Sequence, residues 1–306
     1  MLSDSNRVVG RIINVQHFSV DDGPGIRTTV FLKGCPLRCA WCHNPESQKT
    51  CLELSFRSDK CTACGICAAV CHAGVHEFTG GVHTVHREWC VHCGNCAKNC
   101  GYDALDVEGK DFSLAALMEQ ILLDRVFYKR SGGVTVSGGE PLMQAAFTRQ
   151  LLAACKAEGL HTCVETCGYG SPEDILAIAE YTDLFLFDYK LTDSALHKRW
   201  TGVSNKRILE NLDLLCRNGA QIVLRCPMIP EVNLCPEHYE GIAMLAGKYP
   251  NIRQIDLEPY HPLGIGKLHS LSRTSEYERA EFLEKEALED VREWIQKRVS
   301  AIVKIT

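Results

Sequence analysis

The sequence predicts an α/β protein built as a partial parallel barrel of six β/α units, interrupted by a cysteine-rich insert. Two observations carry this prediction. Short apolar runs alternate with amphipathic stretches over most of the 306 residues, a pattern typical of successive βα units. Residues 51–108 break the alternation and hold a repeated cysteine pattern. We therefore predict that residues 1–50 and 109–306 form the barrel and that residues 51–108 form a separate inserted domain.

Each strand is predicted where a short apolar run is bounded by polar or turn residues. The expected strands are 28–32, 133–136, 161–164, 183–187, 221–224 and 254–257. The expected helices are 113–128, 144–158, 172–181, 206–218, 236–248 and 276–299. Strands that alternate with helices favour a parallel sheet, because a helix returns the chain to the same edge before the next strand.

The composition argues against a nucleic-acid or membrane partner. The formal net charge is -5 and no dense Lys/Arg block occurs, so the chain lacks the basic surface that a polyanion attracts. Residues 1–30 hold no basic segment followed by an apolar run, and no stretch approaches about 18 consecutive apolar residues. We therefore expect a soluble, cytoplasmic protein that acts as a monomer.

Cysteine is unusually abundant, with 18 residues in the chain. Reducing compartments disfavour structural disulfides, so clustered cysteines there indicate metal ligands or redox groups. Cys35, Cys39 and Cys42 lie in FLKGCPLRCAWCHNPE with the spacing CxxxCxxC. A closed zinc or iron–sulfur site takes four protein ligands, so three thiolates with no fourth beside them fit a metal centre that keeps one position open.

Eight further cysteines form two copies of one pattern, CTACGICAAVC and CVHCGNCAKNC. The repeat resembles bacterial two-cluster ferredoxins, in which three cysteines of a run hold one four-iron cluster and the fourth serves the other. The resemblance implies one cluster on Cys61, Cys64, Cys67 and Cys100, and a second on Cys71, Cys90, Cys93 and Cys96. His72 and Gly101 stand where such runs usually have proline. Zinc stays an alternative, because CxxC pairs also build zinc sites.

Polar groups follow each predicted strand at its carboxyl end. They are the CxxxCxxC loop, SGGEP at 137–141, ETCG at 165–168, DYK at 188–190, Arg225, and EPYHP at 258–262. The carboxyl ends of parallel strands line one face of a sheet or barrel. All six groups are therefore expected to meet at one ligand site.

The CxxxCxxC trio followed by a Gly-Gly-Glu-Pro turn resembles the radical S-adenosylmethionine (SAM) superfamily. With its flanks included, the chain is similar to the activating enzymes of glycyl radical enzymes. The shared segments, in order, are DDGPGIRTTVFLKGCPLRCAWCHNPES, SGGEP, VETCG, DYK, GVSN and EPYHPLG. The resemblance implies a partial (β/α)6 radical SAM barrel, SAM as cofactor and, in the subgroup with a ferredoxin-like insert, three four-iron four-sulfur clusters.

The resemblance also implies which residues hold SAM. Gly138, Gly139 and Glu140 would bind its amino end, because glycines permit close backbone approach. Lys190 would face the carboxylate, and His261 would reach the methionine or ribose. Trp41 occupies the aromatic position just before the third cysteine.

Other roles concern a cation and the partner. Asp188, Glu165 and Thr166 match a place where a related activase holds a monovalent cation beside SAM. Asp22 and His43 correspond to positions that face the partner's glycine loop, and Arg225 is a candidate for holding either the SAM carboxylate or the partner peptide.

The function implied is that of an oxidoreductase that cleaves SAM to a 5'-deoxyadenosyl radical, which removes hydrogen from a backbone glycine of a cognate glycyl radical enzyme. Flavodoxin or ferredoxin would supply the electron. Two alternatives stay open: a radical SAM enzyme that acts on a small molecule or other peptide, and a ferredoxin-like electron carrier. The carrier hypothesis gives no use to the open trio. The cysteines without ligand spacing are expected to be small buried hydrophobes: Cys51, Cys155, Cys163, Cys167, Cys216, Cys226 and Cys235.

Overall fold

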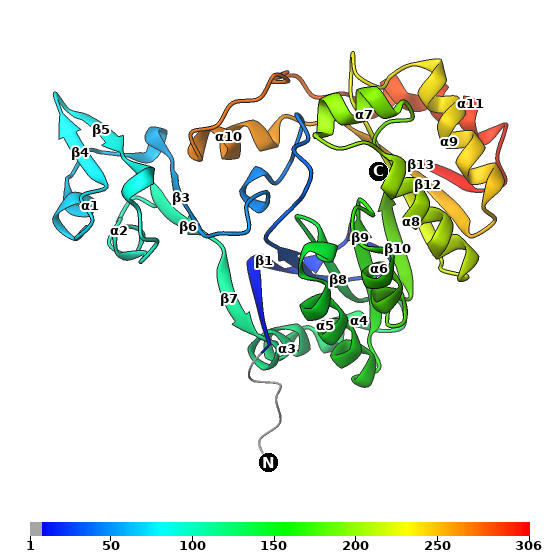
Figure 1. Ribbon diagram of the computed structural model, residues 1–306, viewed down its shortest axis with the longest axis horizontal. Coiled ribbons are helices and arrows are strands. Elements are labelled where there is room, and N and C mark those ends of the chain that lie inside the picture. Colours follow the sequence, from blue (N-terminus) through cyan, green and yellow to red (C-terminus); the bar gives the residue numbers. More distant parts are fainter. Residues whose placement is uncertain (1–7) are drawn as a thin grey trace.

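The computed structural model describes residues 8–306, so residues 1–7 of the predicted barrel domain lie outside the described part. The centre of this part is a nine-stranded sheet with the order β13-β12-β11-β10-β9-β8-β2-β1-β7 (Figure 1). Strands β2 and β8 to β13 run parallel, whereas β1 is antiparallel to both β2 and β7. Their bounds are β1 Val9–Ser19, β2 Arg27–Leu32, β7 Lys110–Ser113, β8 Gly133–Gly138, β9 His161–Thr166, β10 Leu184–Asp188, β11 Ile222–Met228, β12 Ile252–Pro259 and β13 Ile302–Ile305.

The predicted α/β class with a mostly parallel sheet is confirmed. Each of the six predicted strands lies within β2 or one of β8 to β12, apart from a residue at some strand starts. Strands β1, β7 and β13 were not predicted. Strand β1 alternates buried and exposed residues only in its first half, and β7 and β13 are four residues each, too short to show a period.

Helices connect the parallel strands. Their bounds are α3 Leu114–Leu123, α4 Arg125–Tyr128, α5 Ala145–Ala157, α6 Pro172–Ala179, α7 Ser194–Thr201, α8 Lys206–Arg217, α9 Pro236–Lys248, α10 Leu263–Ser270 and α11 Glu289–Gln296. Polar caps fix several starts: the Ser113, Ser171 and Asp193 side chains each accept a hydrogen bond from a first-turn backbone N–H. Proline at the first turn of α6 and α9 adds to this, because it needs no N–H there.

One predicted helix is largely wrong. Residues 276–284 are not helical, and α11 begins only at Glu289, after a 3-10 turn at Lys285–Leu288. The segment before the turn is held by distant partners instead: the Tyr277 hydroxyl donates to the Pro230 carbonyl, and Leu283 N donates to Tyr260 O. The predicted helix 113–128 is also interrupted at Asp124, whose carboxylate accepts from the Thr28 hydroxyl of β2.

The main hydrophobic core lies between the sheet and its helices. Val134 and Val136 of β8 and Leu151 of α5 are fully buried in it, as are Leu212 of α8 and Ile255 of β12. This core fixes the strand register, and the carboxyl ends of the parallel strands lie together at one edge of the sheet.

The cysteine-rich segment forms a small substructure of its own, which projects to one side of the molecule (Figure 1). Strand β3 (Glu53–Phe56) pairs antiparallel with β6 (Leu105–Glu108), and β4 (His76–Thr79) pairs with β5 (Val82–Val85) in a hairpin. Two short helices, α1 (Ile66–Ala69) and α2 (Asn95–Lys98), complete it. Leu54, Val75 and Leu105 form a hydrophobic cluster with Cys67 and Cys96, separate from the main core.

Candidate functional site

The cysteine trio lies in the loop that follows β2. Backbone bonds fix this loop: Arg38 N donates to Thr201 O at 2.7 Å, and Ala40 N donates to Trp200 O at 3.0 Å. Cys35, Cys39 and Cys42 all line a cavity of about 230 Å³, here called the inner cavity. Burial raises the pKa of all three, that of Cys39 to about 12, and neighbouring thiols add to the rise for Cys35 and Cys39. Such thiols become ligands when a metal displaces their protons, so the trio fits an iron–sulfur cluster.

Most of the predicted site residues meet at the inner cavity. Those that line it are Asp22, Cys35, Cys39, Trp41, Cys42, His43, Gly138, Gly139, Asp188 and Lys190. Glu165 and Thr166 of the expected cation site line it too. Glu140, Arg225 and His261 do not.

Gly138 and Gly139 bring the end of β8 against the cysteine loop. Gly138 has φ +106°, and a Cβ there would stand 2.3 Å from Leu32 N. A Cβ on Gly139 would stand 2.2 Å from Gly34 O. Real Cβ atoms do not approach backbone atoms this closely, so both positions require glycine for packing inside the protein as well as for an open cavity wall.

The Glu140 side chain points into the protein rather than into the cavity. It is fully buried, and its carboxylate accepts hydrogen bonds from Leu142 N at 3.0 Å, the Thr166 hydroxyl at 2.6 Å and Cys167 N at 2.8 Å. Burial raises the pKa of Glu140, while these donors oppose the rise. Glu140 therefore ties the turn after β8 to the end of β9.

Acidic side chains that line the inner cavity form ion pairs with Lys190 and Arg225. Lys190 Nζ lies 2.8 Å from Asp188 Oδ2. Arg225 Nη1 lies 3.0 Å from Glu165 Oε1, and Arg225 Nε donates to Glu258. Burial disfavours the charges of Lys190 and Arg225, but the facing carboxylates outweigh it and raise the pKa of both. Lys190 and Arg225 therefore stay charged. They neutralise the carboxylates of Asp188, Glu165 and Glu258, which would otherwise need a metal cation to balance their charge.

Glu258 is a site residue that the sequence analysis did not single out. It lines the inner cavity, and burial raises its pKa to about 7, with Asp188 and Glu165 acting in the same direction and Arg225 opposing. The sequence analysis placed it only within EPYHP at 258–262, the polar group at the end of the sixth predicted strand, and gave it no role of its own.

Two further side chains, those of Arg27 and Cys167, shape the site although the sequence analysis gave them no role in it. Arg27 of β2 is fully buried and donates to Thr135 Oγ1 at 2.6 Å and to Pro24 O at 2.9 Å, which holds the turn after β1 against β8. An arginine inside an apolar strand was the signal for it. Cys167 adds a fourth thiol to the wall of the inner cavity, and burial with the adjacent Glu140 carboxylate raises its pKa well above the ordinary value.

Asp22 is fixed from two sides. Its Oδ2 accepts from the Ser19 hydroxyl at 2.5 Å and from the Thr29 hydroxyl at 2.7 Å, and its backbone carbonyl accepts from Thr135. The carboxylate is thereby held at the cavity wall on the side of the segment 20–24.

His43 lines both the inner cavity and a second cavity of about 520 Å³, here called the lateral cavity. The lateral cavity is lined by residues of the segment 20–24 and by Arg225, and it shares His43 and Glu258 with the inner one. The His43 ring stacks on His261, with centroids 3.6 Å apart. Burial and the neighbouring His261 lower the pKa of His43 to about 3, so this imidazole is neutral.

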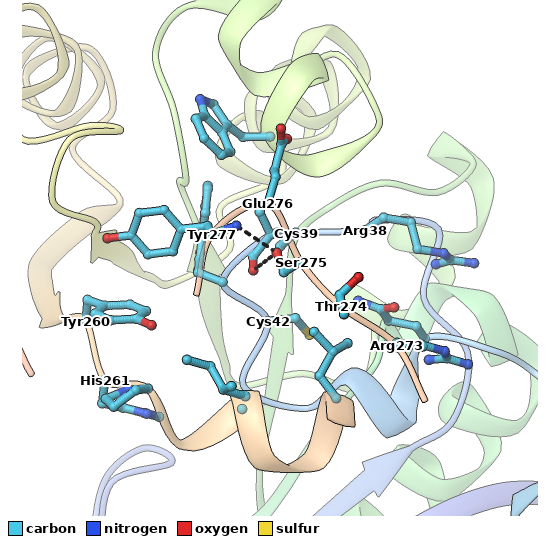
Figure 2. Close-up of a pocket in the computed structure, with 18 of the residues that line it drawn as sticks. Arg38, Cys39, Cys42, Tyr260, His261, Arg273, Thr274, Ser275, Glu276 and Tyr277 are labelled. Atoms are coloured by element: carbon cyan, nitrogen blue, oxygen red, sulfur yellow. Dashed lines mark hydrogen bonds between the residues drawn. The ribbon is translucent and has the colours of Figure 1, made fainter. Parts of the chain in front are cut away.

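A third cavity, of about 500 Å³, lies on the other side of the cysteine loop and is called the outer cavity (Figure 2). Cys39, Trp41 and Cys42 line both it and the inner cavity. Figure 2 shows Ser275 beside this loop; its hydroxyl donates to Ala40 O at 2.6 Å and accepts from Tyr277 N at 3.1 Å. The irregular segment after α10 therefore braces the loop from outside. Trp41 packs within this brace, in a buried cluster with Tyr260 and Tyr277.

The eight cysteines of the insert gather around two small cavities. One is lined by Cys61, Cys64, Cys67 and Cys100, and the other by Cys71, Cys90, Cys93 and Cys96. A histidine accompanies each set, His83 the first and His76 the second. Four thiols around one small hollow suit a four-iron cluster or a zinc ion.

The cysteines without ligand spacing follow the expectation of burial with two exceptions. Cys155, Cys163, Cys167, Cys216 and Cys226 are buried. Cys235 is half-buried, and Cys51 is exposed, which corrects the prediction for that residue. Cys51 lies between the cysteine loop and β3, where no core covers it.

None of the helices within residues 8–306 is long and apolar enough to cross a bilayer.

Comparisons with known proteins agree with this geometry. Residues 85–241 match the family model of the Radical SAM superfamily. The choline trimethylamine-lyase activating enzyme of Oleidesulfovibrio alaskensis is 41% identical over 267 residues, which cover 85% of this chain and 86% of that protein. The trans-4-hydroxy-L-proline dehydratase activating enzyme of Clostridioides difficile is 38% identical over 285 residues, which cover 92% and 94%.

Among solved structures, a radical SAM methyltransferase from Sphaerobacter thermophilus superposes with a TM-score of 0.53 at 14% identity, over 95% of this chain and 76% of that one. This likeness concerns the fold alone. The identities to the activating enzymes, over most of both chains, concern the whole protein. The chain is an enzyme of the radical SAM superfamily and belongs to the activating enzymes of glycyl radical enzymes.

Proposed function

We propose that this enzyme activates a cognate glycyl radical enzyme by removing a hydrogen atom from one of its backbone glycines. The observation that carries the proposal is that the inner and lateral cavities adjoin at His43 and Glu258, which line both. The inner cavity holds the cysteine trio, and the lateral cavity, of about 520 Å³, has room for a short loop of a second protein. A glycine carried on such a loop could reach the reacting centre while the partner's body stays outside.

The residues of the inner cavity suit SAM and one four-iron cluster. Cys35, Cys39 and Cys42 would hold the cluster, which together with SAM supplies reductive cleavage to a 5'-deoxyadenosyl radical. Lys190 offers a charged donor to the SAM carboxylate, and the backbone of Gly138 and Gly139 offers hydrogen-bonding groups to its amino end. His261, beside His43, lies where the ribose or methionine would extend toward the lateral cavity.

The partner-facing roles fall to Asp22 and His43. Asp22 is held rigidly by Ser19 and Thr29, so it can position a peptide rather than follow it. His43 is neutral, so it can contact an uncharged peptide backbone without adding charge to the site. Arg225, already paired with two carboxylates, lines the lateral cavity and can donate a hydrogen bond to a partner carbonyl, whereas the expected contact with the SAM carboxylate is left to Lys190.

The insert would hold two further four-iron clusters. The grouping of its thiols into two sets of four supports this assignment and the crossed pattern of the ferredoxin resemblance. These clusters would relay electrons from flavodoxin or ferredoxin, or shape the surface to which a partner binds. A cytoplasmic location and a monomeric state complete the proposal.

The test follows the hydrogen atom. With its partner present under anaerobic reducing conditions, the enzyme should generate a long-lived glycyl doublet in electron paramagnetic resonance. A partner labelled with deuterium at glycine Cα should pass the label into 5'-deoxyadenosine.

Two variants separate the roles of the inner cavity. Lys190→Ala should weaken SAM binding and so depress SAM cleavage with or without partner. Asp22→Ala should leave partner-free cleavage largely intact and depress deuterium transfer from the partner. If deuterium enters 5'-deoxyadenosine only from a labelled small molecule, the enzyme acts on small molecules and the activase proposal is wrong.

A further inference from the structure

The two cysteine cavities of the insert are joined by a pair of histidines. His83 lines the cavity of Cys61, Cys64, Cys67 and Cys100, and His76 lines the cavity of Cys71, Cys90, Cys93 and Cys96. Both histidines belong to the β4–β5 hairpin, where His76 pairs with Val85 and His83 pairs with Phe78. The hairpin thus places one imidazole at each cavity and brings the two rings into contact.

The contacts form a continuous chain. His76 Nδ1 lies 3.0 Å from His83 Nε2, and His83 Nδ1 lies 3.3 Å from Cys61 Sγ. The His83 ring is held between two aromatic side chains: it stacks on Phe78 with centroids 4.3 Å apart and meets the edge of Phe56 at 4.5 Å. Its orientation toward the thiol is therefore set by packing.

The direction of the hydrogen bonds follows from the chemistry of the sulfur. A neutral imidazole has one N–H donor and one acceptor nitrogen. Cys61 as a thiolate ligand can only accept, so His83 Nδ1 donates to it and His83 Nε2 is left as an acceptor. His76 Nδ1 then donates to His83 Nε2, and both N–H groups point toward the first cavity. Consistently, His76 Nε2 is buried without a hydrogen-bond partner in the described structure, as an acceptor can be.

The second cavity receives a different contact. There a backbone amide, His92 N, lies 3.4 Å from Cys90 Sγ. The sequence repeat makes the two cysteine sets alike, but the hairpin histidines make their surroundings unequal.

We propose that His83, oriented by His76, raises the reduction potential of the cluster on Cys61, Cys64, Cys67 and Cys100 above that of the other insert cluster. The inference rests on the proposed function in one respect, the presence of two clusters in the insert. The physical reason is that a donor aimed at a ligand sulfur stabilises the added negative charge of the reduced cluster. The first cluster thereby becomes the more easily reduced member of the pair.

The experiment is a redox titration of the full chain, reconstituted anaerobically, in a Cys35→Ala/Cys39→Ala/Cys42→Ala background so that only insert clusters contribute to the electron paramagnetic resonance signal. His83→Phe should make one cluster harder to reduce by at least about tenfold in the one-electron equilibrium, about 59 mV, and leave the other in place. His83→Gln keeps an N–H donor and should restore part of the shift. His76→Phe should lower the same potential by less, because His83 loses its orienting partner.

His86→Phe is the matched control. His86 follows the same hairpin, stacks on Trp89 with centroids 4.4 Å apart and lies 3.0 Å from the Glu77 carboxylate, away from the thiol contacts of His83. Its replacement should leave both potentials unchanged.

Several results would overturn the inference. Unchanged potentials in His83→Phe, or equal shifts in His83→Phe and His83→Gln, would show that no hydrogen bond is involved. If the His83→Phe variant does not assemble its cluster, the His76→Phe variant provides the test. Unchanged reduction potentials in His76→Phe would then contradict the proposal. Cys67, His76 and His83 also bring their ligand atoms within 4.8 Å of one another, so nitrogen ligation of a single metal ion, seen as histidine nitrogen coupling, would replace the hydrogen bond with a direct ligand.

Failure of the proposed function has a different signature. If the parent variant holds no clusters in the insert, its iron content will fall far short of about eight per chain, and the cluster assignment is wrong before any histidine is changed.

Discussion

Gly138 shows how one backbone position decides where the cysteine loop lies. Its φ of +106° is costly for any other residue, and a Cβ would collide with β2 at Leu32 N, 2.3 Å away. Gly138→Ala should therefore cost about 3 to 5 kcal/mol of stability from strain and overpacking together, and lower SAM affinity by displacing the loop. Thermal unfolding and SAM titration measure the two effects.

Gly159→Ala is the control for Gly138→Ala. Gly159 also has positive φ, +72°, but a Cβ there would meet nothing within 4 Å. Only the backbone strain remains, about 1 kcal/mol, and SAM binding should be unchanged. Equal losses in the two variants would show that the close approach to β2 does not matter.

Glu258 makes stability depend on pH. Its folded-state pKa of about 7 lies above the ordinary value of 4.5, chiefly because of burial, so the folded protein binds the proton more tightly than the unfolded chain. The resulting stability is present at pH values below the unfolded pKa and is lost as pH rises through about 7. Glu258→Gln cannot ionise and should escape this loss.

Thermal midpoints of the SAM-free protein check this prediction. Relative to the wild type, Glu258→Gln should gain about 1 to 3 kcal/mol of stability between about pH 5 and about pH 8. A difference between the two proteins that stays constant over this range would mean that Glu258 titrates normally. Glu180, an exposed partner of Arg149, provides the control, because Glu180→Gln should show no such trend.

At the scale of elements, Arg87 connects the insert to the end of α10 and to the residues after it. It lies in the 3-10 turn Arg87–Trp89, and its guanidinium donates to Ser272 Oγ at 2.6 Å, Ser270 O at 2.7 Å and Leu54 O at 3.1 Å. The residues after α10 that it contacts continue into the segment bracing the cysteine loop. Arg87 is thus one polar link between the insert and that brace, beside the ion pair of Arg273 with Glu53 of β3.

Arg87→Ala should therefore speed hydrogen exchange at the amides of residues 271–273, by about tenfold if the link contributes about 1.4 kcal/mol. Arg57→Ala is the matched control, since Arg57 donates only to Asp103 O, within the insert. Exchange at residues 271–273 that is unaffected in Arg87→Ala, or raised equally in both variants, would contradict the role of Arg87.

At the scale of the whole molecule, the trio and the insert cysteines lie beside different hydrophobic clusters. The insert cysteines surround their own hydrophobic cluster of Leu54, Val75 and Leu105, and the trio lies at the strand ends of the barrel. Replacing Cys35, Cys39 and Cys42 together by Ala should remove about four of about twelve irons and abolish SAM cleavage, while the insert keeps the remainder. Iron analysis and 5'-deoxyadenosine formation measure both outcomes. Loss of nearly all the iron would mean that the insert cysteines take up iron only when the trio is intact.

The parts of the fold that depend on local sequence patterns were predictable. Six parallel strands and most connecting helices follow from apolar runs and turn residues, and helix caps such as Ser113 and Ser171 stand where predicted helices start. The segment 276–284 was misjudged as helix because its charged sequence lacks strong breakers. Its actual path depends on Tyr260, Pro230 and Ala40, which lie far away along the chain.

The sequence alone determined the chemistry of the site: three thiols at CxxxCxxC spacing, the glycine turn after the next strand, and a polar group at each later strand end. These are local facts, because spacing and strand ends are properties of consecutive residues. Only the tertiary structure decided which side chains face the cavity. The Glu140 carboxylate accepts hydrogen bonds from Thr166 and Cys167 inside the protein. Arg225 forms ion pairs with both Glu165 and Glu258, and the His83 ring contacts the Cys61 thiol. The physical reason is that a buried polar group must find partners, and those partners come from elements that only the packing of the sheet and of the insert brings together.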